Sequence, residues 1–394
     1  MAHPRIDLVY FNAGGGHRAA AEALQGVLLE REPGWSVRLV DLFRVLDPEG
    51  WFPRLTGFAP ETYYNKRLAA GFTLGLAQEL KVLQAMIRAA HPQLVSRLAR
   101  HWQHTAPDMV VTLVPNFNRS MGQALSMVDS RVPFVTVMTD LADLPPHFWI
   151  EPGYTQHLVC GTERAMRQAL DQGLPPTCVH RVSGMIMRPS FYRAPAVDRE
   201  EARHELGFTG DMPVGVVMFG GHGSSAMRRI AASLDDQPLI LMCGRNASLA
   251  QALARQSARA PRHVVGHTTD VAHWLRLADY FIGKPGPGSL SEALHCGLPV
   301  IVARNAWTMP QERWNTEWVR EQGLGLVLGG FTEVRAGVQD LLAELPRWRA
   351  SVAQFRNQAL FEVAALLRLM ADSRLGPHTP GTTGSALTLA EAYS

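Results

Sequence analysis

Two glycine-rich segments of this chain combine small residues with side chains that can carry out acid–base chemistry. The first reads N-A-G-G-G-H-R at residues 12–18, and the second reads G-K-P-G-P-G-S-L-S-E-A-L-H-C-G at residues 283–297. Each follows a short apolar run and leads into a helix-like stretch, which is typical of a strand, a turn and a helix. Glycine allows close backbone approach, and unpaired N–H groups at a helix start bind phosphate. Both segments therefore favour contact with a phosphate-bearing ligand.

The second segment has the composition of a nucleotide diphosphate site. We expect Ser289 to cap its helix and Glu292, one turn in, to accept hydrogen bonds from ribose hydroxyls. Lys284 is one of three lysines in the chain and could stabilise a leaving diphosphate. A third loop, G-G-H-G-S-S at residues 220–225, again offers backbone donors to an anion. The alternative is a set of tight turns that only pack helix on strand.

Two side chains at the ends of predicted strands could move a proton. His17 stands at the start of the first helix, where the helix dipole lowers an imidazole pKa and keeps the ring neutral. Asp140 follows the apolar run at residues 133–139, and the carboxyl ends of parallel strands face the ligand crevice. Structural roles remain open, because His17 could cap the helix and Asp140 could cap a turn.

The predicted strands that must position these residues are short, and those at residues 108–114 and 133–139 are near-continuous apolar runs, as in buried parallel strands. They occupy residues 6–11, 36–43, 108–114, 133–139, 157–160, 214–219, 238–243, 264–268, 280–282 and 300–303. A chain of 394 residues suits two domains. We predict two Rossmann-like α/β domains at residues 1–190 and 191–372, with a helix over 341–370 and a mobile tail at 373–394.

Composition excludes several classes of protein. With 46% hydrophobic and 19% charged residues the chain is expected to fold. No apolar run approaches the ~18 residues of a membrane span, and no signal-peptide core precedes the first strand, so a cytoplasmic protein is expected. The four cysteines show no C-x-x-C spacing, so no metal site is predicted. A net charge of +3 is too small to indicate nucleic acid as a partner.

Residues 51–100 contain seven basic and two acidic residues, a larger surplus than that of the whole chain. The start of this stretch places aromatic rings beside cations, as in surfaces that bind a lipid headgroup layer. A helical hairpin with its rings inward and its charges in water would have the same composition. The candidate acceptor and membrane residues are Trp51, Phe52, Arg54, Lys66 and Arg67.

Together these motifs resemble one family of glycosyltransferases. G-G-G-H-R-A-A-A-E-A at residues 14–23 is similar to the opening motif of the monogalactosyldiacylglycerol synthase and processive diacylglycerol glucosyltransferase family. G-K-P-G-P-G-S-L-S-E-A-L and P-Q-E-R-W-N resemble its donor-site segments, which the bacterial N-acetylglucosaminyltransferase of peptidoglycan precursor synthesis shares more loosely. The similarity extends over most of residues 5–370. Asn12-Ala13 before the glycines and His222 in the third loop depart from the family pattern.

The resemblance implies a GT-B fold, in which two Rossmann-like domains face each other across a cleft. It also implies a UDP-sugar donor. No separate cofactor is expected, and the sequence contains no D-x-D motif, which agrees with a reaction that needs no metal. His17 would face the anomeric carbon, Glu292 would bind ribose, and the base would meet the backbone near Gly266. The diphosphate would contact Gly221, Gly223, Ser224, Gly286, Gly288 and Ser289, while the sugar would contact Gln311, Glu312 and Asn315.

The main functional hypothesis is inverting transfer of a hexose from a UDP-sugar to a lipid acceptor such as diacylglycerol. His17, or a pair that it forms with Asp140, would remove the proton of the acceptor hydroxyl. The protein would bind peripherally at the inner face of the membrane. A UDP-sugar 2-epimerase and a non-catalytic sensor of UDP-sugar or lipid are the alternatives, and the basic aromatic stretch counts against the epimerase.

Overall fold

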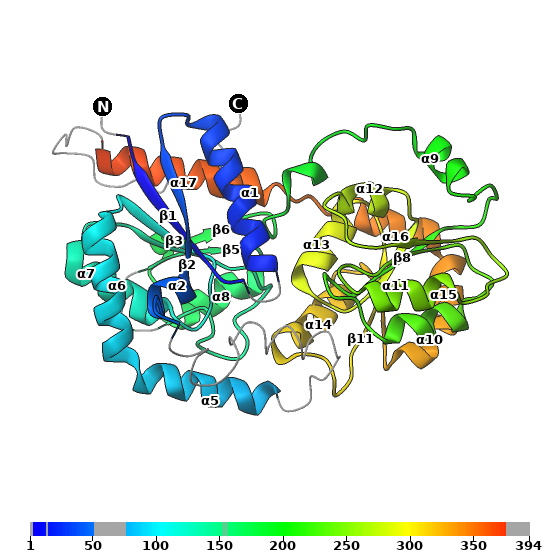
Figure 1. Ribbon diagram of the computed structural model, residues 1–394, viewed down its shortest axis with the longest axis horizontal. Helices are drawn as coiled ribbons and strands as arrows, with labels where there is room; N and C mark the ends of the chain where they lie inside the picture. The colour runs from blue at the N-terminus through cyan, green and yellow to red at the C-terminus, as the bar shows by residue number, and fades with distance from the viewer. Residues whose placement is uncertain (1–2, 13–14, 51–75, 152, 154–155, 376–394) are drawn as a thin grey trace.

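The computed structural model describes all residues except 1–2, 13–14, 51–75, 152, 154–155 and 376–394. The predicted membrane residues Trp51, Phe52, Arg54, Lys66 and Arg67 lie outside the described residues, as does most of the predicted tail. Two lobes, each built on a six-stranded parallel sheet, lie side by side (Figure 1). The predicted α/β class with two Rossmann-like sheets is confirmed.

The first sheet has the strand order β2-β1-β3-β4-β5-β6, and every neighbouring pair is parallel. Its strands are β1 (Arg5–Tyr10), β2 (Ser36–Asp41), β3 (Met109–Thr112), β4 (Phe134–Val137), β5 (His157–Cys160) and β6 (Val179–Arg181). The second sheet has the order β12-β11-β10-β7-β8-β9. Its strands are β7 (Gly215–Met218), β8 (Leu239–Met242), β9 (Arg262–Val265), β10 (Tyr280–Gly283), β11 (Val300–Ala303) and β12 (Gly325–Leu328).

The helices connect consecutive strands and cover both faces of each sheet, which buries the apolar strands on two sides. In the first lobe they are α1 (Gly16–Arg31), α2 (Leu42–Leu46), α5 (Leu76–Ala89), α6 (His91–Thr105), α7 (Asn118–Asp129) and α8 (Glu163–Asp171). Those that follow are α9 (Arg199–Glu205), α10 (Ala226–Ser233), α11 (Ala247–Ala254), α12 (Val271–Arg276), α13 (Pro287–His295), α14 (Arg313–Glu321), α15 (Val334–Ala343), α16 (Leu345–Val352) and α17 (Ala359–Leu375). No helix in the described part of the chain is both long and apolar enough to cross a membrane.

Strand order places the glycine segments where ligands bind in open parallel sheets. In the first sheet β1 lies between β2 and β3, and in the second β7 lies between β8 and β10. The chain therefore leaves neighbouring strands toward opposite faces at these two points, and the carboxyl ends of the strands form a crevice there. Residues 12–17 follow β1, residues 219–225 follow β7, and residues 284–288 follow β10. All three predicted loops thus lie at switch points of the two sheets.

The C-terminal helix returns to the first lobe. Ala359, Leu360 and Val363 of α17 are buried in the same core as β1 and α1, and Glu362 accepts hydrogen bonds from the backbone and hydroxyl of Ser183. Figure 1 shows α17, in orange-red, beside α1. This helix was predicted to belong to the second domain, residues 191–372, but it packs in the core of the first lobe. The single helix expected over 341–370 is divided into α15, α16 and α17. Pro346 in the first turn of α16 cannot continue α15, which accounts for the first break.

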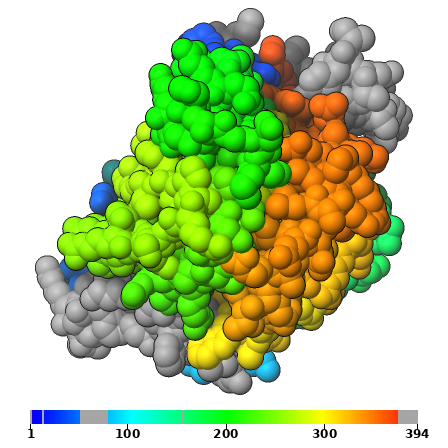
Figure 2. All heavy atoms as spheres, turned by 90° about the vertical axis from the view of Figure 1, so that its right-hand side faces the viewer, coloured from blue at the N-terminus to red at the C-terminus, as the bar shows by residue number. Residues whose placement is uncertain are grey.

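The two lobes pack against each other through a shared apolar cluster near the segment that connects them. Leu141, Ala142 and Phe191 share one buried cluster with Val216 and Leu290 of the second lobe. At the outer end of the second lobe, Arg199 and Arg203 of α9 and Arg349 of α16 all pair with the buried carboxylate of Asp279. Figure 2 shows these green and orange segments adjoining on that face. Through Asp279, these ion pairs therefore connect α9, at the start of the second lobe in the sequence, with α16 near the end of that lobe.

Candidate active site

His17 is held at the carboxyl ends of β1 and β3. Gly15 precedes α1 with a φ of 79°, a left-handed conformation that glycine adopts without strain, and His17 lies in the first turn. Its Nδ1 is 2.7 Å from the carbonyl oxygen of Leu113 and 3.0 Å from Oγ1 of Thr139. Because a carbonyl only accepts, Nδ1 carries the proton and donates it to Leu113. Nε2 then keeps its lone pair and can act as a base.

Burial keeps the His17 ring neutral. It lowers the pKa of His17 to about 4, and the hydrogen bond to the Leu113 carbonyl only partly offsets this. The neutral state matches the sequence prediction. The cause, burial of the ring, was not indicated by the sequence, from which the helix dipole was the expected cause.

Trp149 connects His17 to Asp140. The centres of the His17 and Trp149 rings are 6.2 Å apart, and Nε1 of Trp149 donates to Oδ2 of Asp140 over 2.9 Å. Trp149 is fully buried, so its N–H group requires such a partner. No hydrogen bond joins His17 and Asp140, so the pair that the sequence suggested is replaced by contacts of both residues with one indole.

Asp143 fixes the loop that carries Trp149. Its carboxylate is fully buried and accepts from the backbone N–H groups of Trp149 and His147, at 2.6 and 3.1 Å. Gln172 donates to the same carboxylate over 3.2 Å. Sequence reasoning missed both Asp143 and Trp149. The signal in the sequence was D-L-P-P-H-F-W at residues 143–149, just after a predicted strand. In this loop a carboxylate is followed closely by a tryptophan, a large aromatic residue that is usually buried.

Groups in both lobes affect the pKa of Asp140. Burial raises its pKa to about 7, the Trp149 hydrogen bond opposes this, the negative charge of Glu312 adds to it, and the positive charge of Lys284 opposes it. The side chain is only 8% exposed. Since Glu312 and Lys284 belong to the second lobe, Asp140 of the first lobe lies close enough to that lobe for its charges to act on the carboxyl group.

Lys284, Glu312 and Asn315 hold the loop after β10. Nζ of Lys284 is 2.8 Å from Oε1 of the buried Glu312, and Nδ2 of Asn315 donates to the Pro285 carbonyl over 2.7 Å. A Cβ atom on Gly286 would lie 3.2 Å from Cε of Lys284 and 3.4 Å from Oε1 of Glu312, so only glycine fits without displacement. Oδ1 of Asn315 is buried and finds no partner among the described residues.

The helix after this loop begins earlier than predicted. α13 starts at Pro287, with Gly286 as its N-cap, so Ser289 lies inside the first turn and makes no cap. Proline has no N–H group to leave unpaired and its φ suits a first helical position, which accounts for the start at Pro287. A Cβ on Gly288 would meet no atom within 4 Å, so this turn faces open space.

The loop after β7 adjoins Lys284. Gly220 and Gly223 have φ values of 74° and 61°, and a Cβ on Gly223 would lie 2.9 Å from the Cys243 carbonyl oxygen. A Cβ on Gly220 would lie 3.7 Å from Cε of Lys284. Burial lowers the pKa of His222, and the charges of Arg245 and Lys284 lower it further. The loop is therefore a turn of glycines with cationic groups around it.

The other predicted donor residues are placed as follows. Ser224 accepts from the Ala226 backbone at 3.2 Å, Gly266 follows β9 and is exposed, and Nε2 of Gln311 is 3.8 Å from the Met309 sulfur. Burial raises the pKa of Glu292 to about 7, and the positive charge of Arg188 opposes this. No described residue makes a hydrogen bond or ion pair with the Glu292 side chain. Gly221 accepts from the Arg245 backbone at 2.9 Å.

The lobes also touch beyond this site. The guanidinium of Arg164, on α8, lies 5.2 Å from the centre of the Trp314 ring at the start of α14. Such a cation–π contact is attractive, and Trp314 is almost fully buried. Among the described residues no group of three or more His, Cys, Asp or Glu side chains is arranged to hold a metal ion.

The two-sheet fold matches solved structures of GT-B proteins. Acinetobacter baumannii MurG superposes with a TM-score of 0.58 at 14% identity, over 93% of this chain and all of that one. A putative UDP-N-acetylglucosamine 2-epimerase of Listeria monocytogenes gives 0.59 at 16% identity, over 96% and 99% of the two chains. At these identities the similarity concerns the fold alone.

Sequence similarity identifies the protein family that this chain resembles. The family described as monogalactosyldiacylglycerol (MGDG) synthase matches residues 17–184. A probable MGDG synthase 2 of Oryza sativa subsp. indica is 29% identical over 82% of this chain and 71% of its own. MGDG synthase 3 of Arabidopsis thaliana is 28% identical over 80% and 69%. The predicted resemblance to the MGDG synthase family is confirmed.

Proposed function

We propose that this protein is an inverting glycosyltransferase that moves a hexose from a UDP-sugar to a lipid acceptor such as diacylglycerol. One observation carries the proposal. His17 and Asp140 contact the same buried indole, and Asp140 is within electrostatic reach of Lys284 and Glu312 beside the glycine loops of the second lobe. Similarity to MGDG synthases supports a lipid as the acceptor.

In the proposed step the acceptor oxygen attacks the anomeric carbon of the donor sugar. A new bond forms between these atoms, the bond from that carbon to the diphosphate oxygen breaks, and UDP leaves with the bonding electrons. Nε2 of His17 takes the hydroxyl proton, since Nδ1 is already committed to the Leu113 carbonyl. Attack opposite the leaving group inverts the configuration of the anomeric carbon.

The second lobe stabilises the departing charge. Backbone N–H groups of the loops after β7 and β10, and the start of α13, offer donors and the positive end of a helix dipole. Lys284 adds a cation between the two loops, held by Glu312. Glu292 is partly buried and has no hydrogen-bond or ion-pair partner among the described residues, which suits acceptance of hydrogen bonds from ribose hydroxyls.

Trp149 gives Asp140 a positioning role. By accepting the indole N–H, Asp140 holds the ring that lies against His17. Its negative charge, when present, also faces Lys284. We therefore assign proton removal to His17 and placement of the ring to Asp140.

Peripheral membrane binding forms part of the proposal, and α5 supports it. Val82, Leu83 and Met86 of this helix are 59%, 43% and 55% exposed, beside the exposed cations Lys81 and Arg88. Apolar side chains flanked by cations bind the interface of an anionic bilayer. Sedimentation with anionic vesicles tests this: the double variant Val82→Ser, Met86→Ser should bind less, whereas Met127→Ser on α7, 67% exposed, should not.

Activity is tested by supplying UDP-glucose, UDP-galactose and UDP-N-acetylglucosamine, each radiolabelled in the sugar, with diacylglycerol vesicles. Label should enter the organic phase with one donor, and the NMR coupling of the product's anomeric proton should show inversion. Product with the donor's own configuration would contradict the mechanism.

Donor incubated without any lipid separates the alternatives. Conversion of UDP-N-acetylglucosamine to its 2-epimer would favour the epimerase, and saturable UDP-sugar binding without product from any acceptor would favour a sensor. Either result would replace the proposal.

A further inference from the structure

Thr139, just after β4, provides a second hydrogen-bond acceptor for the ring of His17. Its Oγ1 lies 3.0 Å from Nδ1 of His17, and the same nitrogen is 2.7 Å from the carbonyl oxygen of Leu113. Leu113 follows β3, which pairs with β4 in the first sheet. Because Nδ1 carries one proton and both oxygens can accept it, two neighbouring strand ends share this N–H group.

The hydroxyl of Thr139 has His17 as its one hydrogen-bond partner among the described residues. The side chain is partly buried and branched at Cβ, so few rotamers are open to it and the hydroxyl is held in place at a small cost in entropy. Valine has nearly the shape of threonine but lacks the hydroxyl. Replacement by valine therefore removes this hydrogen bond with little change in packing.

Two acceptors fix the ring more closely than one. A single N–H···O contact tolerates rotation of the ring about its axis, whereas a second oxygen in a different place restricts that rotation. The imidazole ring is rigid, so the direction of Nδ1–H also sets the direction of the Nε2 lone pair. Asp140, the next residue, acts on the same ring by another route, because it accepts from Nε1 of Trp149, whose ring centre is 6.2 Å from that of His17.

We propose that Thr139 is a positioning residue for proton removal by His17: its hydroxyl oxygen accepts the Nδ1–H together with the Leu113 carbonyl and so fixes the direction of the Nε2 lone pair. This inference rests on the proposed function, in which Nε2 takes the proton of the acceptor hydroxyl. Once Nε2 holds that proton the ring is a cation, and both oxygens then accept from a charged donor and stabilise it. The hydroxyl should therefore act on kcat more than on donor binding.

Steady-state transfer by Thr139→Val and Thr139→Ser tests the proposal in the full chain. We expect Thr139→Val to lower kcat by about tenfold, the value of one hydrogen bond to a charged group, with the KM for the UDP-sugar within about twofold. Thr139→Ser keeps a hydroxyl and should restore kcat to within about threefold. A serine variant as slow as the valine variant, or a raised KM with unchanged kcat, would overturn the positioning role.

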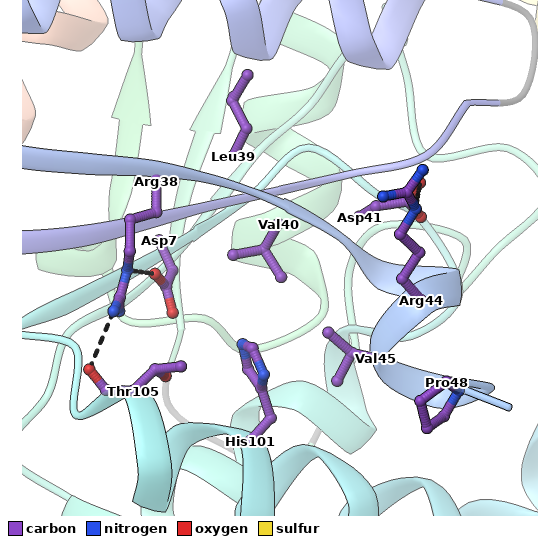
Figure 3. Close-up of a pocket in the computed structure, with 10 residues that line it drawn as sticks. All are labelled: Asp7, Arg38, Leu39, Val40, Asp41, Arg44, Val45, Pro48, His101 and Thr105. Carbon is purple, nitrogen blue, oxygen red and sulfur yellow. Dashed lines mark hydrogen bonds and ion pairs between the residues drawn. The ribbon is translucent and has the colours of Figure 1, made fainter.

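Thr105→Val is the matched control. Thr105, at the end of α6, lines a pocket of the first lobe together with Arg38 and His101 (Figure 3), and no hydrogen bond joins it to His17. Its hydroxyl has no hydrogen-bond partner among the described residues, so the same substitution removes no hydrogen bond there. Its kcat and melting temperature should match those of the unaltered chain. An equal fall in kcat would show that the effect of Thr139→Val is a general one.

Proton exchange of the His17 ring measures the same hydrogen bond without any sugar transfer. NMR spectra of the chain with isotopically labelled histidine, free of ligand, give the ring N–H resonance, which is assigned by its loss in His17→Ala. We expect exchange with water at least about threefold faster in Thr139→Val and nearly unchanged in Thr139→Ser. Unchanged exchange in Thr139→Val would reject the proposal. Faster exchange there, with no transfer from any donor by the unaltered chain, would reject the proposed function while confirming that Thr139 holds the ring.

Discussion

The two lobes present different chemistry at corresponding places. Each sheet has a switch point where a glycine loop follows a strand, after β1 in the first lobe and after β7 in the second. In the first lobe this place is occupied by side chains: the partly buried His17 and the buried Trp149 and Asp140, joined by hydrogen bonds and ring contact. In the second it is occupied by backbone, with glycines in left-handed conformations around Lys284.

This difference follows from what each task requires. Moving a proton requires a side chain with an altered pKa, and burial provides it for His17. Holding an anion requires N–H groups that no side chain obstructs, and glycine provides them. In the proposed mechanism, the same arrangement of strand, loop and helix therefore serves acid–base chemistry in one lobe and anion binding in the other.

The largest expected effect comes from removing the base of the first lobe. His17→Ala should lower kcat by about 10³-fold, within the range for loss of a general base, and leave UDP affinity within about twofold. Steady-state transfer and UDP titration measure the two quantities. His104→Ala, on an exposed side chain, is the control. Comparable turnover of His17→Ala would remove the proposed division between the lobes.

The raised pKa of Asp140 predicts a stability effect with a defined pH window. In the unfolded chain the carboxyl ionises near its ordinary pKa of 3.8, whereas in the folded protein it stays protonated to about 7. Because only the unfolded chain ionises here, the free energy of unfolding falls by about 1.4 kcal/mol per pH unit as pH rises from 4 to 7, and no further above 7. Asp140→Asn should gain stability relative to the unaltered chain across that window.

Thermal melts at half-unit pH steps check this difference. Asp171→Asn, which alters an exposed carboxylate at the end of α8, serves as the control and should show no such window. A difference between Asp140→Asn and the unaltered chain that stays constant from pH 4 to 7 would contradict the raised pKa.

A backbone change should damage the second lobe selectively. Gly223→Ala places a Cβ at a φ of 61° and 2.9 Å from the Cys243 carbonyl oxygen, so the loop must shift. A left-handed alanine costs roughly 1–2 kcal/mol; the free loop relaxes to avoid this cost, and restoring its shape on binding predicts about tenfold weaker UDP affinity. Calorimetric titration with UDP measures it. Gly210→Ala, where a Cβ meets nothing within 4 Å, should bind UDP normally; equal loss there would point to general destabilisation.

The smallest effect is expected from removing one hydrogen bond of the first lobe. Trp149→Phe keeps an aromatic ring near His17 but removes the N–H group that Asp140 accepts. Loss of about 1 kcal/mol of ordering predicts a roughly fivefold fall in kcat with unchanged UDP affinity. A fall as large as that of His17→Ala would show that the indole takes part in the reaction directly.

The central strands and the three glycine loops could be predicted from the sequence. Strands such as β3, β4, β7 and β10 are buried on both faces, so they are continuous apolar runs. The edge strands β6 and β12 were missed, because V-H-R and G-L-V-L are short and only partly buried. An edge strand owes its state to one neighbour, and that pairing is a tertiary property.

The candidate site could be predicted only as far as local pattern reaches. His17 and Lys284 stand inside glycine motifs, so their neighbours along the chain mark them. Trp149 lies 132 positions from His17, and its ring contact exists only after β1 and β4 join the same sheet. Likewise the return of α17 to the first lobe depends on which core its apolar face packs against, and the sequence of α17 does not indicate which of the two cores that is.

The position of α17 has a consequence for the newly made polypeptide. The helix that completes the core around β1 and α1 is the last described element to be synthesised, so the N-terminal half leaves the ribosome with part of its apolar surface uncovered. Final closure of that half must await translation of the whole C-terminal half. A nascent chain stalled before residue 359 should therefore need a chaperone to shield this surface.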